Sequence, residues 1–463
     1  MNNKIGLGQN TCTSTCASTC EKSIYEDNKI KPEQGAGSVI KSSYDQHISL
    51  NDAFSAREIN LENILTKHNE KLEITRMFKE LPSGGLKPSD YLRLVESHIP
   101  EELISSQNFA EIRHLASNFN NDLTSFFGFE TRLMNPDARS DYLIAVSARK
   151  GQRDALINLI KSDEFSIFLE QPEWRQVAKF AMTWADPHSV LHEKILGLWL
   201  EFDTAEESID KPTPNVFLHT EPLYFDFPED FKKCTWLTAT ALPLLTGHPL
   251  SKKLEQSFLN CIKRLPKGAS LFHVGVMLSR PISSIRVVIK GIRPKQIVQY
   301  LKTVGLSYGA KELSLLIAEL EKMANRIVLN FDVIENGIGQ KIGIECSFYP
   351  ENNDQYQPEP RWGAFLDYLV EKGLCLPEKR DALINFLPDT NYEYISSLIK
   401  KEEPLILATK ILDDKFIPNL VRQMGHIKIV YCHNNPLEAK AYFGGRLFGF
   451  VDSAHQQPSV MKV

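Results

Sequence analysis

Alternating apolar and polar positions recur along the chain from about residue 126 onward. In residues 341–348, for example, Ile342, Ile344 and Cys346 fall on one face and Gly343 and Glu345 on the other. A period of two predicts a β-strand with one buried face. The predicted strands are residues 127–134, 141–149, 194–203, 215–221, 271–278, 285–290, 327–334, 341–348, 426–432 and 439–445.

These ten strands fall into five pairs, each joined by a segment rich in Asn, Asp, Pro, Gly or Ser, the residues that form turns. Helical runs with apolar residues at steps of three and four separate the pairs. They occupy residues 151–169, 174–182, 251–265, 294–305, 311–323, 360–373 and 379–387. The result is a repeated strand-strand-helix array, which predicts an α+β fold with an antiparallel sheet.

Two architectures satisfy this pattern. One is an open antiparallel sheet with helices on one face and water on the other. The second is a ten-stranded antiparallel barrel with helices outside and a polar lumen that has room for a ligand. Because closure removes the exposed edges of a long sheet, the number of hairpins favours the barrel, over residues 126–450.

The segments outside the barrel differ in composition. Residues 1–52 are rich in Cys, Ser and Thr and contain no Phe, so we predict a disordered tail. Its cysteines, Cys12, Cys16 and Cys20, lack the paired spacing of a structural zinc site, and no metal is inferred. Residues 53–125 predict a helical segment that begins near Ser55, and residues 451–463 form a C-terminal tail.

Net charge and amino-acid composition limit the kinds of partner and the location that we expect. The net charge of −5 lacks the positive footprint that phosphate-backbone binding needs, so we expect no nucleic acid partner. No run of about 18 apolar residues is present, so we expect no membrane insertion. The N-terminus has no apolar core of a secretory signal, and the later cysteines are single, so we expect a cytoplasmic protein.

The repeat over residues 126–450 resembles the ABBA-fold aromatic prenyltransferases, which are barrels of ten antiparallel strands with catalysis in the lumen. The resemblance rests on the repeat and not on a sequence motif. It implies a prenyltransferase of natural product biosynthesis that transfers an allylic prenyl group from a prenyl diphosphate, with no essential metal inferred. The acceptor would be an aromatic small molecule or a peptide side chain. The alternative is a non-catalytic protein that binds a peptide or a partner protein on the same scaffold.

The resemblance implies that cationic and phenolic groups of the lumen bind the diphosphate. The candidates on the non-helix faces of the strands are Arg132, Arg286, Lys290, Lys341, Lys428, Lys440 and Tyr442. Lys440 and Tyr442, two residues apart on one strand, could share a single phosphate. If the chain is such an enzyme, we expect at least four of the basic residues to converge on one pocket. If these side chains instead point into solvent at scattered positions, only the alternative of a non-catalytic binding protein would remain.

Two further roles concern the reaction itself. An allylic cation needs aromatic walls, and Trp199 and Tyr142 are the candidates for shielding it. Glu201 is the candidate catalytic residue, because a buried carboxylate can deprotonate or orient the acceptor. One departure from the family is Val288, which separates the basic residues Arg286 and Lys290 on their strand.

Overall fold

The computed structural model describes residues 77–79, 87–119, 123–124, 126–148, 151–204, 212–224, 232–281, 283–349, 359–388, 393–394 and 416–451. The predicted tail over residues 1–52 and nearly all of the C-terminal tail lie outside these ranges. So does most of the first predicted helix of the 53–125 segment.

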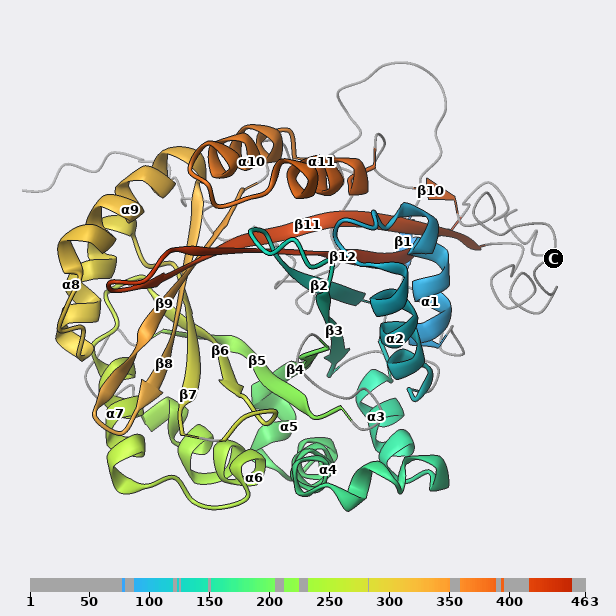
Figure 1. Ribbon diagram of the computed structural model, residues 1–463. Helices are drawn as coiled ribbons and strands as arrows, with labels where there is room; N and C mark the ends of the chain where they lie inside the picture. Colours follow the sequence, from blue (N-terminus) through green and yellow to red (C-terminus); the bar gives the residue numbers. More distant parts are fainter. Residues whose placement is uncertain are drawn as a thin grey trace, which may run out of the picture. The chain divides into compact units, whose positions relative to one another are not determined.

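Ten strands close into a ring (Figure 1). They are β2 (Phe126–Arg132), β3 (Ser140–Ser147), β4 (Ile195–Phe202), β5 (Pro214–Tyr224), β6 (Ser270–Val276), β7 (Ile285–Lys290), β8 (Arg326–Ile334), β9 (Gly337–Ser347), β11 (Phe416–Cys432) and β12 (Glu438–Val451). Neighbours in the ring pair antiparallel, and β12 pairs with both β11 and β2, which closes it. The predicted α+β fold with a ten-stranded antiparallel barrel is therefore confirmed.

Two short strands extend the sheet beside the ring. β1 (Met77–Lys79) pairs with β12, and β10 (Glu393–Tyr394) pairs with β11. β1 lies within the segment 53–125 that the sequence predicts as helical, so the prediction is wrong for these three residues. Pairing with the long strand β12 satisfies its backbone groups in place of a helix.

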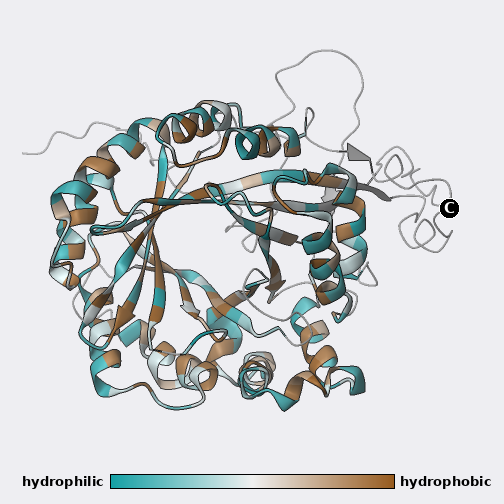
Figure 2. Cartoon of the chain, viewed as in Figure 1, coloured by the Kyte–Doolittle hydropathy of each residue, from teal (hydrophilic) through white to brown (hydrophobic). Residues whose placement is uncertain are grey.

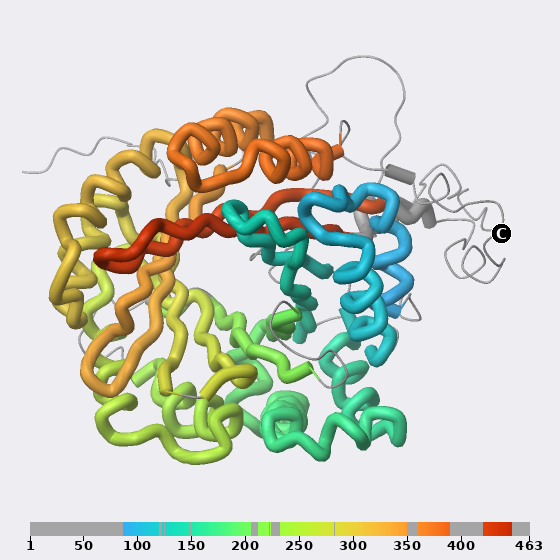
Figure 3. The backbone as a smooth tube through the Cα atoms, viewed as in Figure 1, coloured from blue at the N-terminus to red at the C-terminus, as the bar shows by residue number. Residues whose placement is uncertain are grey.

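Helices surround the ring, as Figures 1 and 3 show. Those of the repeat are α3 (Gln152–Ile160), α4 (Pro172–Ala185), α5 (Val190–Lys194), α6 (Leu242–Thr246), α7 (Lys252–Lys263), α8 (Pro294–Val304), α9 (Ala310–Met323), α10 (Arg361–Glu371) and α11 (Pro377–Phe386). In α7, Ser251 caps the first turn by accepting from the Leu254 amide at 3.2 Å. The buried residues of α7 recur at steps of three and four, so one stripe packs on the barrel.

The N-terminal helices α1 (Pro88–Val95) and α2 (Ser106–Ser117) belong to the predicted helical segment. Asn108 of α2 is fully buried and ties this segment to the barrel. Its side-chain oxygen accepts from the Ser140 amide at 2.9 Å, and its amide group donates to the Thr204 hydroxyl at 3.2 Å. The segment is therefore part of the outer helical layer.

Alternation along the strands separates two layers. Ile342, Ile344 and Cys346 have no exposed surface and belong to the core between strands and helices. Figure 2 shows hydrophobic and hydrophilic residues interleaved along the same strands. The alternate positions, including Glu345, point into the ring. We call this enclosed interior the lumen.

Candidate functional site

A cavity of about 90 Å³ lies in the centre of the lumen. We call it the central cavity. Its aromatic walls are Phe126, Trp199, Phe217 and Tyr442, and its ionisable residues are Glu201, Glu345, Arg286, Lys428, His273 and His426. These side chains come from most strands of the ring, so closure of the barrel brings them together.

The aromatic wall forms an apolar cluster separate from the outer core. Trp199 packs edge-on against Phe126, with ring centroids 5.1 Å apart, and Phe217 completes the cluster. A Cβ at Gly275 would lie 2.6 Å from the Phe217 ring, so glycine is what allows this ring to lie across β6. Trp199 thus lies in the lumen, where the sequence predicts it.

Tyr142 does not. Its side chain has no exposed surface and lies in the core between barrel and helices, among Phe129 and Phe202. The predicted placement of Tyr142 as a lumen shield is therefore wrong. Every residue of β3 is buried, so alternation could not show which side chains point inward.

Lys440 and Tyr442, which the sequence analysis suggests could share a phosphate, instead share the carboxylate of Glu130 on β2. Lys440 Nζ donates to Glu130 Oε1 at 2.5 Å, and the Tyr442 hydroxyl donates to Glu130 Oε2. Burial would raise the pKa of Glu130, but the ammonium groups of Lys440 and Lys428 and these hydrogen bonds outweigh it and hold the pKa well below its usual range. Glu130 is a site residue that the sequence analysis missed, although it shares a strand face with Arg132.

Glu201 lines the central cavity, as its candidate role requires. Burial and the nearby Glu130 carboxylate raise the pKa of Glu201 to about 8, against the opposing effects of Lys428 and Arg286. At neutral pH the carboxyl therefore holds a proton and can donate a hydrogen bond. Above its pKa it becomes a base that lines the central cavity.

Ion pairs surround one end of the barrel, where the two strands of each pair are joined. Each pairs a cation with a carboxylate: Arg132 with Asp141 at 3.3 Å, Arg280 with Asp203 at 3.1 Å, Arg286 with Asp332 at 2.9 Å and Lys341 with Glu438 at 3.6 Å. Burial and Glu130 raise the pKa of Asp141 to about 7, although Arg132 opposes this. Three predicted diphosphate-binding residues, Arg132, Arg286 and Lys341, are thus engaged with carboxylates.

Lys290 lies toward the opposite end, with its ammonium 4.4 Å from the centre of the Phe272 ring. Nearby, His219 Nδ1 and His273 Nε2 are 3.0 Å apart, and one of the two nitrogens donates to the other. Burial, His219 and Lys290 lower the pKa of His273, which keeps this ring neutral at neutral pH. Neither histidine was identified from the sequence.

The predicted cations therefore spread along the lumen. Of the six basic candidates, Arg286 and Lys428 line the central cavity, and Lys440 lies beside it through Glu130. The prediction that at least four of them converge on one pocket is therefore wrong. Scattering over solvent is not observed either, since Lys341 is the one fully exposed member of the set.

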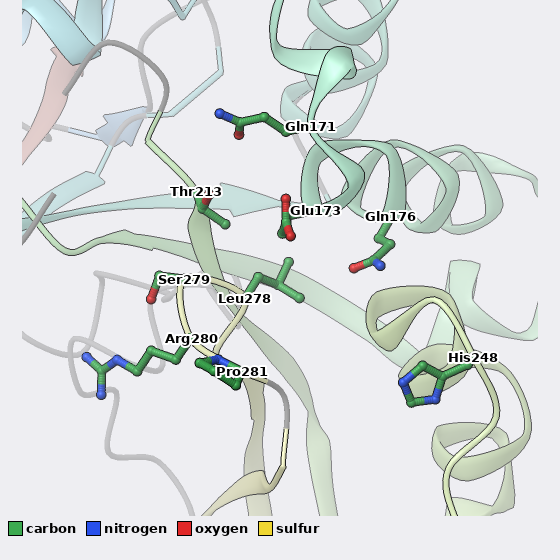
Figure 4. Close-up of a pocket in the computed structure, with 9 residues that line it drawn as sticks. All are labelled: Gln171, Glu173, Gln176, Thr213, His248, Leu278, Ser279, Arg280 and Pro281. Atoms are coloured by element: carbon green, nitrogen blue, oxygen red, sulfur yellow. The ribbon is translucent and has the colours of Figure 1, made fainter. Parts of the chain in front are cut away.

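A second pocket, of about 600 Å³, lies outside the ring between α4 and the loop that joins β6 to β7 (Figure 4). Glu173 and Gln176 of α4 face Leu278 and Ser279 of that loop. Ser279 and Arg280 both donate to Asp203, at 2.7 Å and 3.1 Å, so the loop is tied to the end of β4. This pocket contains none of the residues predicted for the site.

No described helix has the length and apolar character that crossing a bilayer requires. Within the described ranges, no three or more His, Cys, Asp or Glu side chains are grouped so that they could hold a metal ion.

No protein-family model matches the chain, and no curated protein matches it. Solved structures that match the chain include 5-dimethylallyl tryptophan synthase from Streptomyces coelicolor in complex with DMASPP and Trp, at 10% identity. That match covers 83% of this chain and 99% of that one, with a TM-score of 0.44. AnaPT from Neosartorya fischeri matches at 10% identity over 77% of this chain and 92% of its own, with a TM-score of 0.45. Prenyltransferase PriB in a binary complex with product diphosphate matches at 11% identity, over 77% and 94% of the two chains, with a TM-score of 0.42.

Proposed function

We propose that this chain is a prenyltransferase, which moves an allylic prenyl group from a prenyl diphosphate to an aromatic small molecule or a peptide side chain. One observation carries the proposal. A closed barrel surrounds a cavity whose wall combines aromatic rings, two cations and a carboxyl of raised pKa. Those are the groups that ionisation of an allylic diphosphate and capture of its cation require.

The proposed reaction assigns each group a task. The bond between the allylic carbon and oxygen breaks, and the electron pair leaves with the diphosphate, whose growing charge Arg286 and Lys428 would stabilise. Lys440 and Tyr442 would take part once a phosphate oxygen competes with Glu130 for their protons. Arg132 and Lys341 at the joined end and Lys290 at the opposite end would act at longer range.

The allylic cation would lie against the π faces of Trp199 and Tyr442. An electron pair of the acceptor ring then forms the new bond to the allylic carbon. The acceptor loses a proton, which the ionised form of Glu201 would accept. Atoms and charge balance, with prenylated acceptor and diphosphate as products.

The length of the prenyl chain is a separate question from the transfer itself. The test is incubation of the full chain with dimethylallyl or geranyl diphosphate and a panel of tryptophan, tyrosine and peptides that contain them.

Diphosphate release and product mass are measured together. We expect a prenylated aromatic product with at least one of the two donors. Release without an acceptor product would indicate hydrolysis and contradict transfer. Peptide binding without any release of diphosphate would favour the non-catalytic alternative.

A further inference from the structure

Lys428 differs from the other buried lysines of the described chain. It lies four residues before the end of β11, lines the central cavity and is 8% exposed. Lys379, which is 1% exposed, donates to two backbone carbonyls at 2.8 Å and 3.2 Å, and Lys440 donates to Glu130. No residue in the described ranges accepts a hydrogen bond from Lys428 Nζ or forms an ion pair with it. Its amine is therefore buried beside a cavity with its protons uncommitted.

Charged groups approach Lys428 from several strands. Cross-strand neighbours in register are Lys440 on β12 and Glu345 on β9. Arg286 of β7 and Glu130 of β2 also act on it electrostatically. Burial and the Arg286 guanidinium lower the pKa of Lys428, and the two carboxylates oppose them without cancelling the effect. The lowered pKa means that a larger share of Lys428 than of an ordinary lysine is in the neutral form, whose free electron pair makes it a nucleophile. The protonated form is the one that would stabilise a diphosphate.

Space for this side chain is built into the neighbouring strand. A Cβ at Gly343 would lie 2.8 Å from Lys428 Cε, so a glycine there lets the lysine cross β9 toward the cavity. The Tyr442 ring centre is 5.9 Å from its Nζ and forms part of the wall. A desolvated lysine beside a second cation is the arrangement by which enzymes make an amine attack carbonyl groups.

We propose that Lys428 forms an imine with a small aldehyde or ketone that enters the central cavity. This activity goes beyond prenyl transfer and does not depend on it. The Nζ electron pair bonds to the carbonyl carbon, and the carbonyl oxygen takes up a proton, for which the Glu201 carboxyl in the same cavity is a donor. The nitrogen returns one proton to Glu201, which leaves a carbinolamine. The C–O bond then breaks as Glu201 protonates the departing hydroxyl, which leaves as water, and the second nitrogen proton restores the Glu201 carboxyl as the C=N bond forms. No oxidant or reductant is needed.

The cavity sets the class of carbonyl compound. A volume of about 90 Å³ with aromatic walls suits a short apolar aldehyde, and propanal is the probe we choose. The full-length protein is incubated near pH 7 with propanal and sodium cyanoborohydride, which reduces an imine to a stable secondary amine. Peptide mapping by mass spectrometry then gives the rate at which each lysine gains a propyl group.

Lys341 is the internal reference, because its side chain is 66% exposed and pairs with Glu438 at the surface. We expect Lys428 to be modified faster than Lys341, because a lowered pKa leaves more of the amine neutral at a given pH. Its rate should also level off at a lower pH. The Lys428→Arg variant should lose that label and keep the labels on exposed lysines.

Modification of Lys341 as fast as Lys428 would overturn the inference. So would a pH profile of Lys428 labelling that matches the profile of Lys341. Because the readout is a covalent mass on one residue, it is independent of diphosphate release. A protein that transfers prenyl groups but leaves Lys428 unlabelled therefore refutes this inference alone, and a labelled Lys428 with no prenyl transfer refutes the proposed function alone.

Discussion

Lys440 and Glu130 form an ion pair of 2.5 Å between the neighbouring strands β12 and β2. The sequence predicts that Lys440 and Tyr442 share one anion, a phosphate; in the structure they share the two oxygens of this carboxylate. The cation in the lumen is thus already balanced, and its removal affects the fold as well as any ligand.

The first prediction concerns the stability of that pair. Glu130→Ala leaves the Lys440 ammonium in the lumen without its carboxylate, and removal of one member of a buried pair costs about 3–5 kcal/mol. Urea denaturation should show a free energy of unfolding lower by about that amount. The matched control is Glu438→Ala, since Glu438 and Lys341 are 54% and 66% exposed, and an exposed pair contributes about 0–1 kcal/mol. Equal losses in both variants would contradict the prediction.

The second prediction concerns stability and pH. The pKa of Glu201 is about 8 in the folded chain and 4.5 as the ordinary value, so between these pH values the folded state holds a proton that the unfolded state has released. Unfolding free energy should therefore fall as pH rises from about 4.5 to about 8, by on the order of a few kcal/mol. Glu201→Gln should flatten this slope.

Asp141 adds to the same slope. Its pKa rises from 3.8 to about 7 on folding, so Asp141→Asn should flatten the slope at its lower end. Glu130, with a lowered pKa, contributes stability that is lost only as pH falls below the ordinary value of 4.5. Urea melts of the wild type and both variants at several pH values separate the three carboxyls, and an unchanged slope in Glu201→Gln would exclude its raised pKa.

The third prediction concerns the rate of the proposed transfer. If ionised Glu201 accepts the acceptor's proton, kcat/KM should rise with pH and level off above about 8. Glu201→Gln should lower kcat/KM by roughly 10²–10⁴-fold and remove the rising limb. Steady-state rates across the pH range test this, and a variant that keeps the rising limb would assign it to another group.

The fourth prediction compares two buried tyrosines. The Tyr142 hydroxyl has no hydrogen-bond partner among the described residues, whereas the Tyr300 hydroxyl donates to the Cys261 carbonyl at 3.0 Å. Tyr142→Phe should leave the unfolding free energy unchanged or raise it slightly, because it removes a buried group that makes no bond. Tyr300→Phe should lower it by about 1 kcal/mol. Thermal and urea unfolding of the pair test the difference, and a loss of prenyl transfer in Tyr142→Phe would contradict its position in the outer core.

Alternation along single strands predicted the barrel and the inner faces well. Trp199, Arg286 and Lys428 point into the lumen because each sits on a strand whose other face is plainly apolar. β3 lacks such a contrast, since both of its faces are buried, and the assignment of Tyr142 failed there. Alternation carries information only where one face meets a polar environment.

Partners across strands could not be predicted in the same way. Glu130 meets Lys440, and Arg286 meets Asp332, because of the register between neighbouring strands. That register depends on how the whole ring closes, and no local pattern contains it. The sequence therefore identified the cations of the lumen and missed the carboxylates that neutralise them.

The hairpin of β11 and β12 completes the ring at both sides, since β11 pairs with β9 and β12 with β2. These are the last strands of the described chain, and a ribosome makes them after the other eight. Until residues 416–451 emerge, the edges of β2 and β9 have no partner and are open to pairing with other chains. Lys428, Lys440 and Tyr442 arrive with this final hairpin. Before this hairpin is made the chain can form at most an open sheet, and the polar centre of the lumen is completed last.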